Sequence, residues 1–64
     1  MNRIKELRKA QNLSQTELSV RALISQPYLH DLENNHRGAK PETYKRIADA
    51  LGVDVDELKD EGVN

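Results

Sequence analysis

The 64-residue sequence contains no cysteine, tryptophan or phenylalanine, and only two tyrosines. The lack of cysteine excludes disulfides and thiolate metal sites, and it is compatible with a reducing cytoplasm. No apolar run approaches the roughly 20 residues of a transmembrane helix, and the charged, amphipathic start MNRIKELRKAQN is unlike a signal peptide. We therefore expect one cytoplasmic domain over residues 1–64, with an aliphatic core, no membrane association and a frayed end at residues 60–64.

Neither sign of charge is in large excess, since the net charge is −1. The distribution is nevertheless uneven: residues 1–48 carry nine Lys or Arg against five Asp or Glu, and residues 49–64 carry one against six. The first three quarters of the chain can therefore present a basic face, as nucleic-acid binding requires. An ordinary solvated surface can show the same asymmetry, so this support is weak.

Apolar residues recur at helical spacing, and no stretch alternates as a half-buried strand would. Asn12 and Gly52 can adopt the left-handed conformation that often ends a helix. We expect an all-α fold of five short helices, at residues 2–11, 15–22, 26–34, 41–51 and 55–59. The positions expected to face inward are Ile4, Leu7, Ala10, Leu18, Ala22, Leu29, Leu32, Tyr44, Ile47, Ala48, Leu51 and Leu58.

The second and third expected helices are each opened by a serine. Ser14 and Glu17 have the spacing of a capping box, in which each side chain accepts a hydrogen bond from the other residue's backbone N–H. Ser25 precedes Pro27, and proline is tolerated in the first turn of a helix. The two caps are so close that only a tight turn at residues 23–24 can join the helices. This arrangement is a helix-turn-helix, whose second helix commonly lies in the major groove of DNA.

An ordered set of short motifs spans most of the chain, roughly from Ile4 to Leu58. It consists of Leu7-Arg8, Leu13-Ser14-Gln15, Leu18, Ala22, Ile24-Ser25, Leu29, Glu33, Pro41 and the run Ile47-Ala48-Asp49-Ala50-Leu51-Gly52-Val53. In these residues the sequence resembles the Xre/Cro-like helix-turn-helix family, to which many phage repressors belong. The resemblance implies a lambda-repressor-like DNA-binding domain whose helix-turn-helix is formed by the second and third helices.

The sequence departs from this family's pattern at the turn and after the third helix. Leu23 stands where the turn usually has glycine, so we expect a left-handed leucine there, at a cost of roughly 1 kcal/mol or more. His30 replaces a usual serine, and Asn35 replaces a usual glycine whose conformation asparagine can adopt. The loop before Pro41 is also longer than is common. These departures affect the geometry of the turn and loop and leave the fold unchanged.

The exposed face of the third helix carries the residues expected to meet base edges, which are Gln26, Pro27, Tyr28 and Asp31. Similar positions in the family meet bases, because only side chains from the first turns of this helix reach the floor of the groove. Gln26 is the strongest candidate, since a glutamine amide can bond to adenine N6 and N7 together. The alternative interpretation is a solvated polar face.

A second set of residues is expected to contact phosphates. Gln15 opens the second helix, whose N-terminal amides and dipole would face a phosphate. The other members of the set are Ser25, Asn35, Arg37 and Lys40, mostly in the loop after the third helix. The alternative interpretation is that these polar groups are merely solvated.

Two further sets are expected to have structural roles. The resemblance implies that Arg8 and Glu33 form a partly buried bidentate ion pair between the first and third helices; two separate surface charges are the alternative. Val53, Val55 and Leu58 are expected to form a two-fold dimer seam, because exposed apolar groups on a small DNA-binding domain often do so. Val53 could instead complete the core.

Catalytic and metal-binding interpretations fail on spacing. Ser25, His30 and Asp31 are spread around one helix and cannot converge as a catalytic triad. His30 and His36 lack the spacing of zinc motifs, and no glycine-rich phosphate loop follows a strand. We therefore expect no enzymatic activity, cofactor, metal or small-molecule substrate.

The sequence thus predicts a transcriptional regulator, of repressor type, that binds a pseudo-palindromic operator in double-stranded DNA as a homodimer. The alternative is a protein-interaction module of the same fold, such as an antirepressor or antitoxin-like partner, with little DNA affinity. The low net charge and Asp31 on the third helix favour that alternative.

Overall fold

The computed structural model describes residues 2–59, and the fraying expected at residues 60–64 lies outside them. The helices in chain order are α1 (Ile4–Ala10), α2 (Gln15–Ala22), α3 (Gln26–Glu33), α4 (Pro41–Leu51) and the 3-10 helix η1 (Val55–Leu58). Within residues 2–59 the strand-like pairing is limited to an isolated antiparallel bridge between Asn2 and Lys59. The prediction of an all-α fold is confirmed, with the last helix a 3-10 helix.

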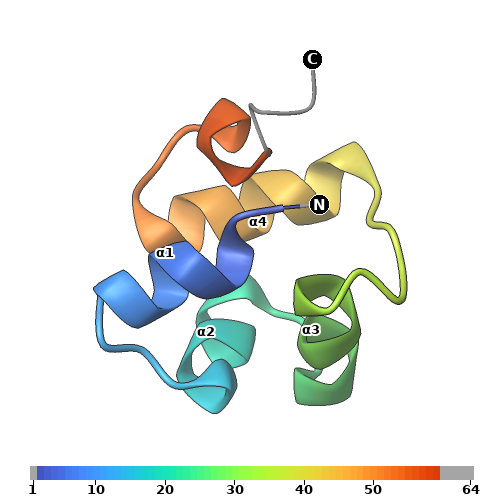
Figure 1. Ribbon diagram of the computed structural model, residues 1–64, viewed down its shortest axis with the longest axis horizontal. Coiled ribbons are helices and arrows are strands. Elements are labelled where there is room, and N and C mark those ends of the chain that lie inside the picture. The colour runs from blue at the N-terminus through green and yellow to red at the C-terminus, as the bar shows by residue number, and fades with distance from the viewer. Residues whose placement is uncertain (1, 60–64) are drawn as a thin grey trace.

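The pair α2 and α3 lies across the domain from η1 (Figure 1). The second helix, α2, packs against both α3 and α4, and η1 also packs against α4. In Figure 1, α2 and α3 lie below α1 and α4, and η1 lies above them. The acidic residues Asp54, Asp56 and Glu57 belong to η1 and its N-cap, so they are on the other side of α1 and α4 from the helix-turn-helix.

An aliphatic core joins all five helices. Its buried hydrophobic side chains are Ile4, Leu13, Leu18, Ala22, Leu29, Leu32, Ile47, Ala48, Leu51 and Leu58. The two tyrosines are only partly buried against this core. The expected aliphatic core is therefore confirmed, and the apolar faces of α2 and α3 pack against it.

The first helix is shorter than predicted, and its inner face differs. The Asn2 side-chain Oδ1 accepts a hydrogen bond from Ile4 N (3.0 Å), and Asn2 pairs with Lys59, so the helix begins only at Ile4. The prediction that Ala10 faces inward is wrong, because Ala10 is exposed. Arg8 is buried instead, since residues four apart lie on one face and Ile4 points into the core.

The predicted bounds of α2 and α4 agree with the structure, and the helix ends follow the predicted signals. Asn12, Leu23, Asn35 and Gly52 all have positive φ, between 59° and 71°. Gly52 is the left-handed C-cap of α4. The third helix ends one residue earlier than predicted, because Asn34 is its C-cap rather than its last residue.

Candidate nucleic-acid interface

The start of α2 is fixed by the predicted capping box. The Ser14 hydroxyl accepts a hydrogen bond from Glu17 N (3.0 Å), and the Glu17 carboxylate accepts one from Ser14 N (2.9 Å). The hydrogen bond from the Ser14 backbone N–H, then that from its hydroxyl, and the charge of Arg21 hold the pKa of Glu17 below its ordinary value. The cap therefore keeps a carboxylate charged at the positive end of the helix dipole.

The turn between α2 and α3 is made by a left-handed leucine, as predicted. Leu23 has φ 60° and ψ 41°, and its N–H donates to Val20 O (3.2 Å). The next N–H, of Ile24, donates to Ser19 O (3.0 Å). Because the Leu23 side chain is 78% exposed, little packing offsets the strain of this conformation.

The third helix begins directly after this turn. The Ser25 hydroxyl accepts a hydrogen bond from Tyr28 N (3.2 Å), and Pro27 occupies the first turn, where it removes no helical hydrogen bond. Ser25, Gln26 and Pro27 are all exposed. The leading end of α3 is thus a solvent-facing surface with a fixed backbone.

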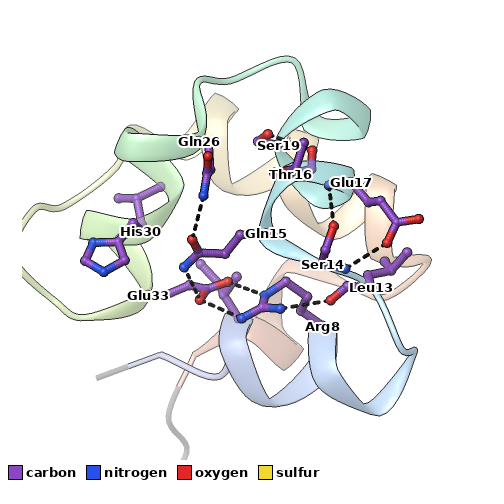
Figure 2. A network of polar contacts seen from close by, with 12 residues as sticks. Arg8, Leu13, Ser14, Gln15, Thr16, Glu17, Ser19, Gln26, His30 and Glu33 are labelled. Atoms are coloured by element: carbon purple, nitrogen blue, oxygen red, sulfur yellow. Dashed lines mark hydrogen bonds and ion pairs between the residues drawn. The ribbon is translucent and has the colours of Figure 1, made fainter.

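A buried ion pair joins α1 to the end of α3 (Figure 2). Arg8 Nε and Nη2 donate to the two carboxylate oxygens of Glu33, over 2.7 and 3.1 Å. The third contact of the guanidinium runs from Nη1 to Leu13 O (2.8 Å). The Glu33 side chain is fully buried, and every buried side-chain nitrogen or oxygen within residues 2–59 has a hydrogen-bond partner. Such a satisfied pair fixes the relative positions of the two helices.

Two glutamines extend this network to the leading end of α3. Gln15 Nε2 donates to Glu33 Oε1 (3.0 Å), and Gln15 Oε1 accepts from Gln26 Nε2 (3.3 Å). Figure 2 shows the resulting chain of contacts from Arg8 through Glu33 and Gln15 to Gln26. Gln15, expected to contact a phosphate, therefore has both ends of its amide engaged within the protein, and the phosphate contact stays a prediction.

The other predicted contact residues lie around α3. Tyr28 and Asp31 are partly buried, whereas the remaining ones are exposed: Gln26, Pro27, Ser25, Asn35, Arg37 and Lys40. Lys40 is the N-cap of α4, without a side-chain capping bond. The structure thus brings the predicted base-contact residues together on one short helix, with the loop residues following from its end.

The loop after α3 folds back onto that helix. Asn35 has φ 60°, and the following N–H, of His36, donates to Asp31 O (2.9 Å). The Asp31 carboxylate faces two histidine rings, with Nδ1 of His30 at 3.7 Å and Nδ1 of His36 at 3.9 Å. Asp31 therefore has one histidine neighbour from its own helix and one from the loop.

Sequence reasoning missed two long-range contacts of this surface. The Arg37 guanidinium lies over the Tyr28 ring, 4.9 Å from its centroid. Asn2 Nδ2 donates to Leu32 O (2.9 Å) and to Asn35 Oδ1 (3.3 Å), which ties the start of the chain to the end of α3. Neither contact follows from a periodic pattern or a local motif, so no signal in the sequence would have found them.

The described part of the chain contains neither a metal-binding cluster nor a membrane-spanning helix. Within residues 2–59, no three His, Asp or Glu side chains are grouped so that they could hold a metal ion. Over the same residues, no helix is long and apolar enough to cross a membrane.

Comparison with known proteins decides the family. The family model described as helix-turn-helix matches residues 4–58. The chain belongs to this helix-turn-helix family. The match includes the capping box of Ser14 and Glu17, the buried ion pair and the loop after α3, so it extends well beyond the two-helix motif.

Several curated proteins resemble this helix-turn-helix chain at 38% identity. The immunity repressor protein of Bacillus phage phi105 matches over 53 residues, 83% of this chain and 37% of the repressor. The ImmF control region 10 kDa protein of the same phage matches over 56 residues, 88% and 62% of the two chains. The HTH-type transcriptional regulator DdrOP3 of Deinococcus deserti also matches over 56 residues, 88% and 43%. The chain thus spans between 37% and 62% of the length of these three curated relatives.

A solved structure has the same fold as this helix-turn-helix domain. It is the N-terminal DNA-binding domain of SinR from Bacillus subtilis, with a TM-score of 0.85 and 30% identity. The likeness covers 97% of this chain and 91% of that one. All five helices of the present chain therefore belong to the shared fold.

One residue of the predicted dimer seam needs correction. Leu58 is fully buried in the core, because η1 docks its single leucine against α4, and its side chain is unavailable to a second copy of this helix-turn-helix protein. Val53 and Val55 are partly buried against the same core. A seam at this end of the molecule is therefore a prediction for the two valines alone.

Proposed function

We propose that this protein is a sequence-specific DNA-binding transcriptional regulator of repressor type, with α3 in the major groove. The main support for the proposal is the hydrogen-bond network that holds the Gln26 side chain in place. This exposed side chain stands in the first turn of α3 and is linked through Gln15 and Glu33 to the buried Arg8. A side chain that reads a base must be held in a fixed orientation, because a contact through two hydrogen bonds tolerates little displacement.

The free groups of the Gln26 amide support the same proposal. Its Nε2 has two hydrogens, one of which is donated to Gln15. Gln26 is exposed, and within residues 2–59 its second N–H and its Oε1 have no hydrogen-bond partner. Adenine presents an N7 acceptor and an N6 donor in the major groove, which match one N–H and one carbonyl oxygen.

The surroundings of α3 suit the DNA backbone. The exposed cations Arg37 and Lys40 follow in the loop, and Gln15, the first residue of α2, contacts Gln26 at the leading end of α3. The acidic residues of η1 are on the opposite side of α1 and α4 from α3, which reduces their repulsion of phosphates bound at α3. The printed names of the relatives, an immunity repressor and a transcriptional regulator, favour the same function.

The proposed assembly is a cytoplasmic homodimer on a pseudo-palindromic operator. Val53 and Val55 supply the apolar part of its seam, and a two-fold dimer would place two copies of α3 about 34 Å apart on one face of DNA. The function is binding without a chemical step, and it calls for no cofactor.

Selection from a random duplex library tests the proposal. We expect the selected sequences to share two inverted half-sites one helical turn apart, and the affinity to fall steeply as salt rises. Sedimentation with and without the selected duplex counts the subunits. Absence of measurable affinity for any duplex at low salt would contradict the proposal and favour a protein-interaction module.

A further inference from the structure

Tyr28 is the one predicted base-contact residue whose ring is covered by a cation from the loop. The Arg37 guanidinium carbon lies 4.9 Å from the ring centroid, within the range of a cation–π contact. Tyr28 is itself partly buried against the core, so its ring is a fixed platform, whereas Arg37 is exposed.

The side of α3 that Tyr28 occupies differs from that of Gln26. An α-helix turns by about 100° per residue, so these two side chains leave the helix about 160° apart, on nearly opposite sides. Gln26 points toward Gln15 and α2, and Tyr28 points toward the loop. Tyr28 is therefore poorly placed to contact the bases that Gln26 would read.

The Arg37 side chain is exposed, and it comes from a loop whose backbone is held in place. The loop backbone before it is held by the hydrogen bond from His36 N to Asp31 O (2.9 Å). Among the described residues, no carboxylate lies within ion-pair distance of the Arg37 guanidinium. The cation is thus ordered by an aromatic ring and not neutralised by an acid, which suits a group that binds a phosphate.

We propose that Tyr28 is a positioning residue for Arg37. The ring holds the guanidinium beside α3, where it binds a backbone phosphate of the duplex, and Tyr28 acts through Arg37 without reading a base. This inference rests on the proposed DNA-binding function and adds to it a specific coupling between the third helix and the loop.

The coupling is tested by measuring affinity for two short duplexes, one with the selected sequence and one scrambled, between about 50 and 200 mM salt. The variants are Arg37→Ala, Tyr28→Leu, Tyr28→Phe and the double variant Arg37→Ala/Tyr28→Leu. Thermal unfolding checks that each variant is folded at the temperature of the assay. The upfield shift of the Arg37 side-chain protons, measured by NMR on the free protein, reports the stack independently of DNA.

We expect Arg37→Ala to weaken both duplexes alike and to lower the salt slope by about one, a change of about fourfold in relative affinity across this salt range. Tyr28→Leu should lower the slope in the same direction and abolish the upfield shift. Tyr28→Phe, which keeps the ring and loses the hydroxyl, should match the wild type. Adding Tyr28→Leu to Arg37→Ala should have no further effect, because coupled residues are not additive.

Additive losses in the double variant would overturn the inference, since Tyr28 would then act independently of Arg37. Relaxed base preference in Tyr28→Phe would do the same, because the hydroxyl would then read a base. In both cases the wild type still binds DNA and the proposed function stands. If the wild type binds neither duplex at low salt, the proposed function and this inference fail together.

Discussion

Gln15 and Gln26 come from different helices and are joined by a hydrogen bond of 3.3 Å between their side-chain amides. The same Gln15 amide donates to Glu33, which Arg8 holds in the buried ion pair. The exposed leading end of α3 is therefore connected to the inside of the domain by three successive polar contacts. This connection explains how a helix of only eight residues can present one side chain in a fixed orientation.

The first prediction separates base reading from backbone binding. Gln26→Ala should lose about 1–3 kcal/mol of discrimination at one base pair of each half-site, because the bidentate amide contact is gone. Lys40→Ala should weaken all sequences alike and lower the salt slope by about one. Affinities for single-base variants of the selected duplex, at several salt concentrations, measure both effects. Unchanged binding in both variants would contradict the docking of α3.

The second prediction concerns the buried ion pair. Arg8→Ala leaves the Glu33 carboxylate buried without its partner, so the free energy of unfolding should fall by about 3–5 kcal/mol. Lys9→Ala, on the exposed side of the same helix, is the matched control and should change it by less than about 0.5 kcal/mol. Urea titration followed by circular dichroism measures both. Equal losses would mean that the pair contributes no more than a surface charge.

The fold could be predicted largely because its signals are local. The capping box of Ser14 and Glu17, the proline in the first turn of α3 and the glycine after α4 each act within a few residues. Such signals mark helix ends directly, and the bounds of α2 and α4 agree with those predicted. The inward position of Ala10 was wrong because a small apolar residue at helical spacing can end up on either face.

The site could be predicted only in part because its geometry depends on distant residues. Gln15 and Glu33 are 18 residues apart, so no local pattern predicts that the Gln15 amide joins Glu33 to Gln26. The stack of Arg37 on Tyr28 crosses the loop in the same way. Leu58 was assigned both to the core and to a dimer seam, and only the packing of η1 on α4 decides for the core.

The third prediction concerns the strained turn. Leu23 is left-handed and mostly exposed, so Leu23→Gly removes strain of about 1–2 kcal/mol while little buried surface is lost. Glycine gains entropy in the unfolded chain, which offsets about 0.5–1 kcal/mol of that gain. We expect a net rise of about 1 kcal/mol or less in the free energy of unfolding, measured by urea titration.

The matched control for this turn is Val20→Gly. Val20 is also exposed and apolar, but it lies inside α2, where glycine destabilises a helix by roughly 0.5–1 kcal/mol. The two glycine variants should therefore change stability in opposite directions. A loss of stability in Leu23→Gly would show that the leucine side chain makes a contribution larger than the strain.

The fourth prediction follows from the lowered pKa of Glu17. Hydrogen bonds from the Ser14 N–H and hydroxyl stabilise the charged carboxylate in the folded chain. A carboxylate whose pKa is lowered by folding contributes stability above its unfolded value, and that contribution is lost as the pH falls through the folded value. The cap should therefore make its full contribution to the free energy of unfolding at neutral pH. That contribution should decline below about pH 4.5, the ordinary pKa of a glutamate.

Glu17→Gln and Ser25→Ala test the origin of this pH dependence. Glu17→Gln keeps an acceptor for the Ser14 N–H but has no charge, so its stability should approach that of the wild type as the pH falls and lie below it at pH 7. Ser25→Ala removes the other serine cap, which has no carboxylate, and should lower stability by about 1 kcal/mol at every pH. Thermal unfolding between pH 3 and 7 measures all three chains. A constant difference between wild type and Glu17→Gln over this range would mean that the carboxylate charge contributes nothing to the cap.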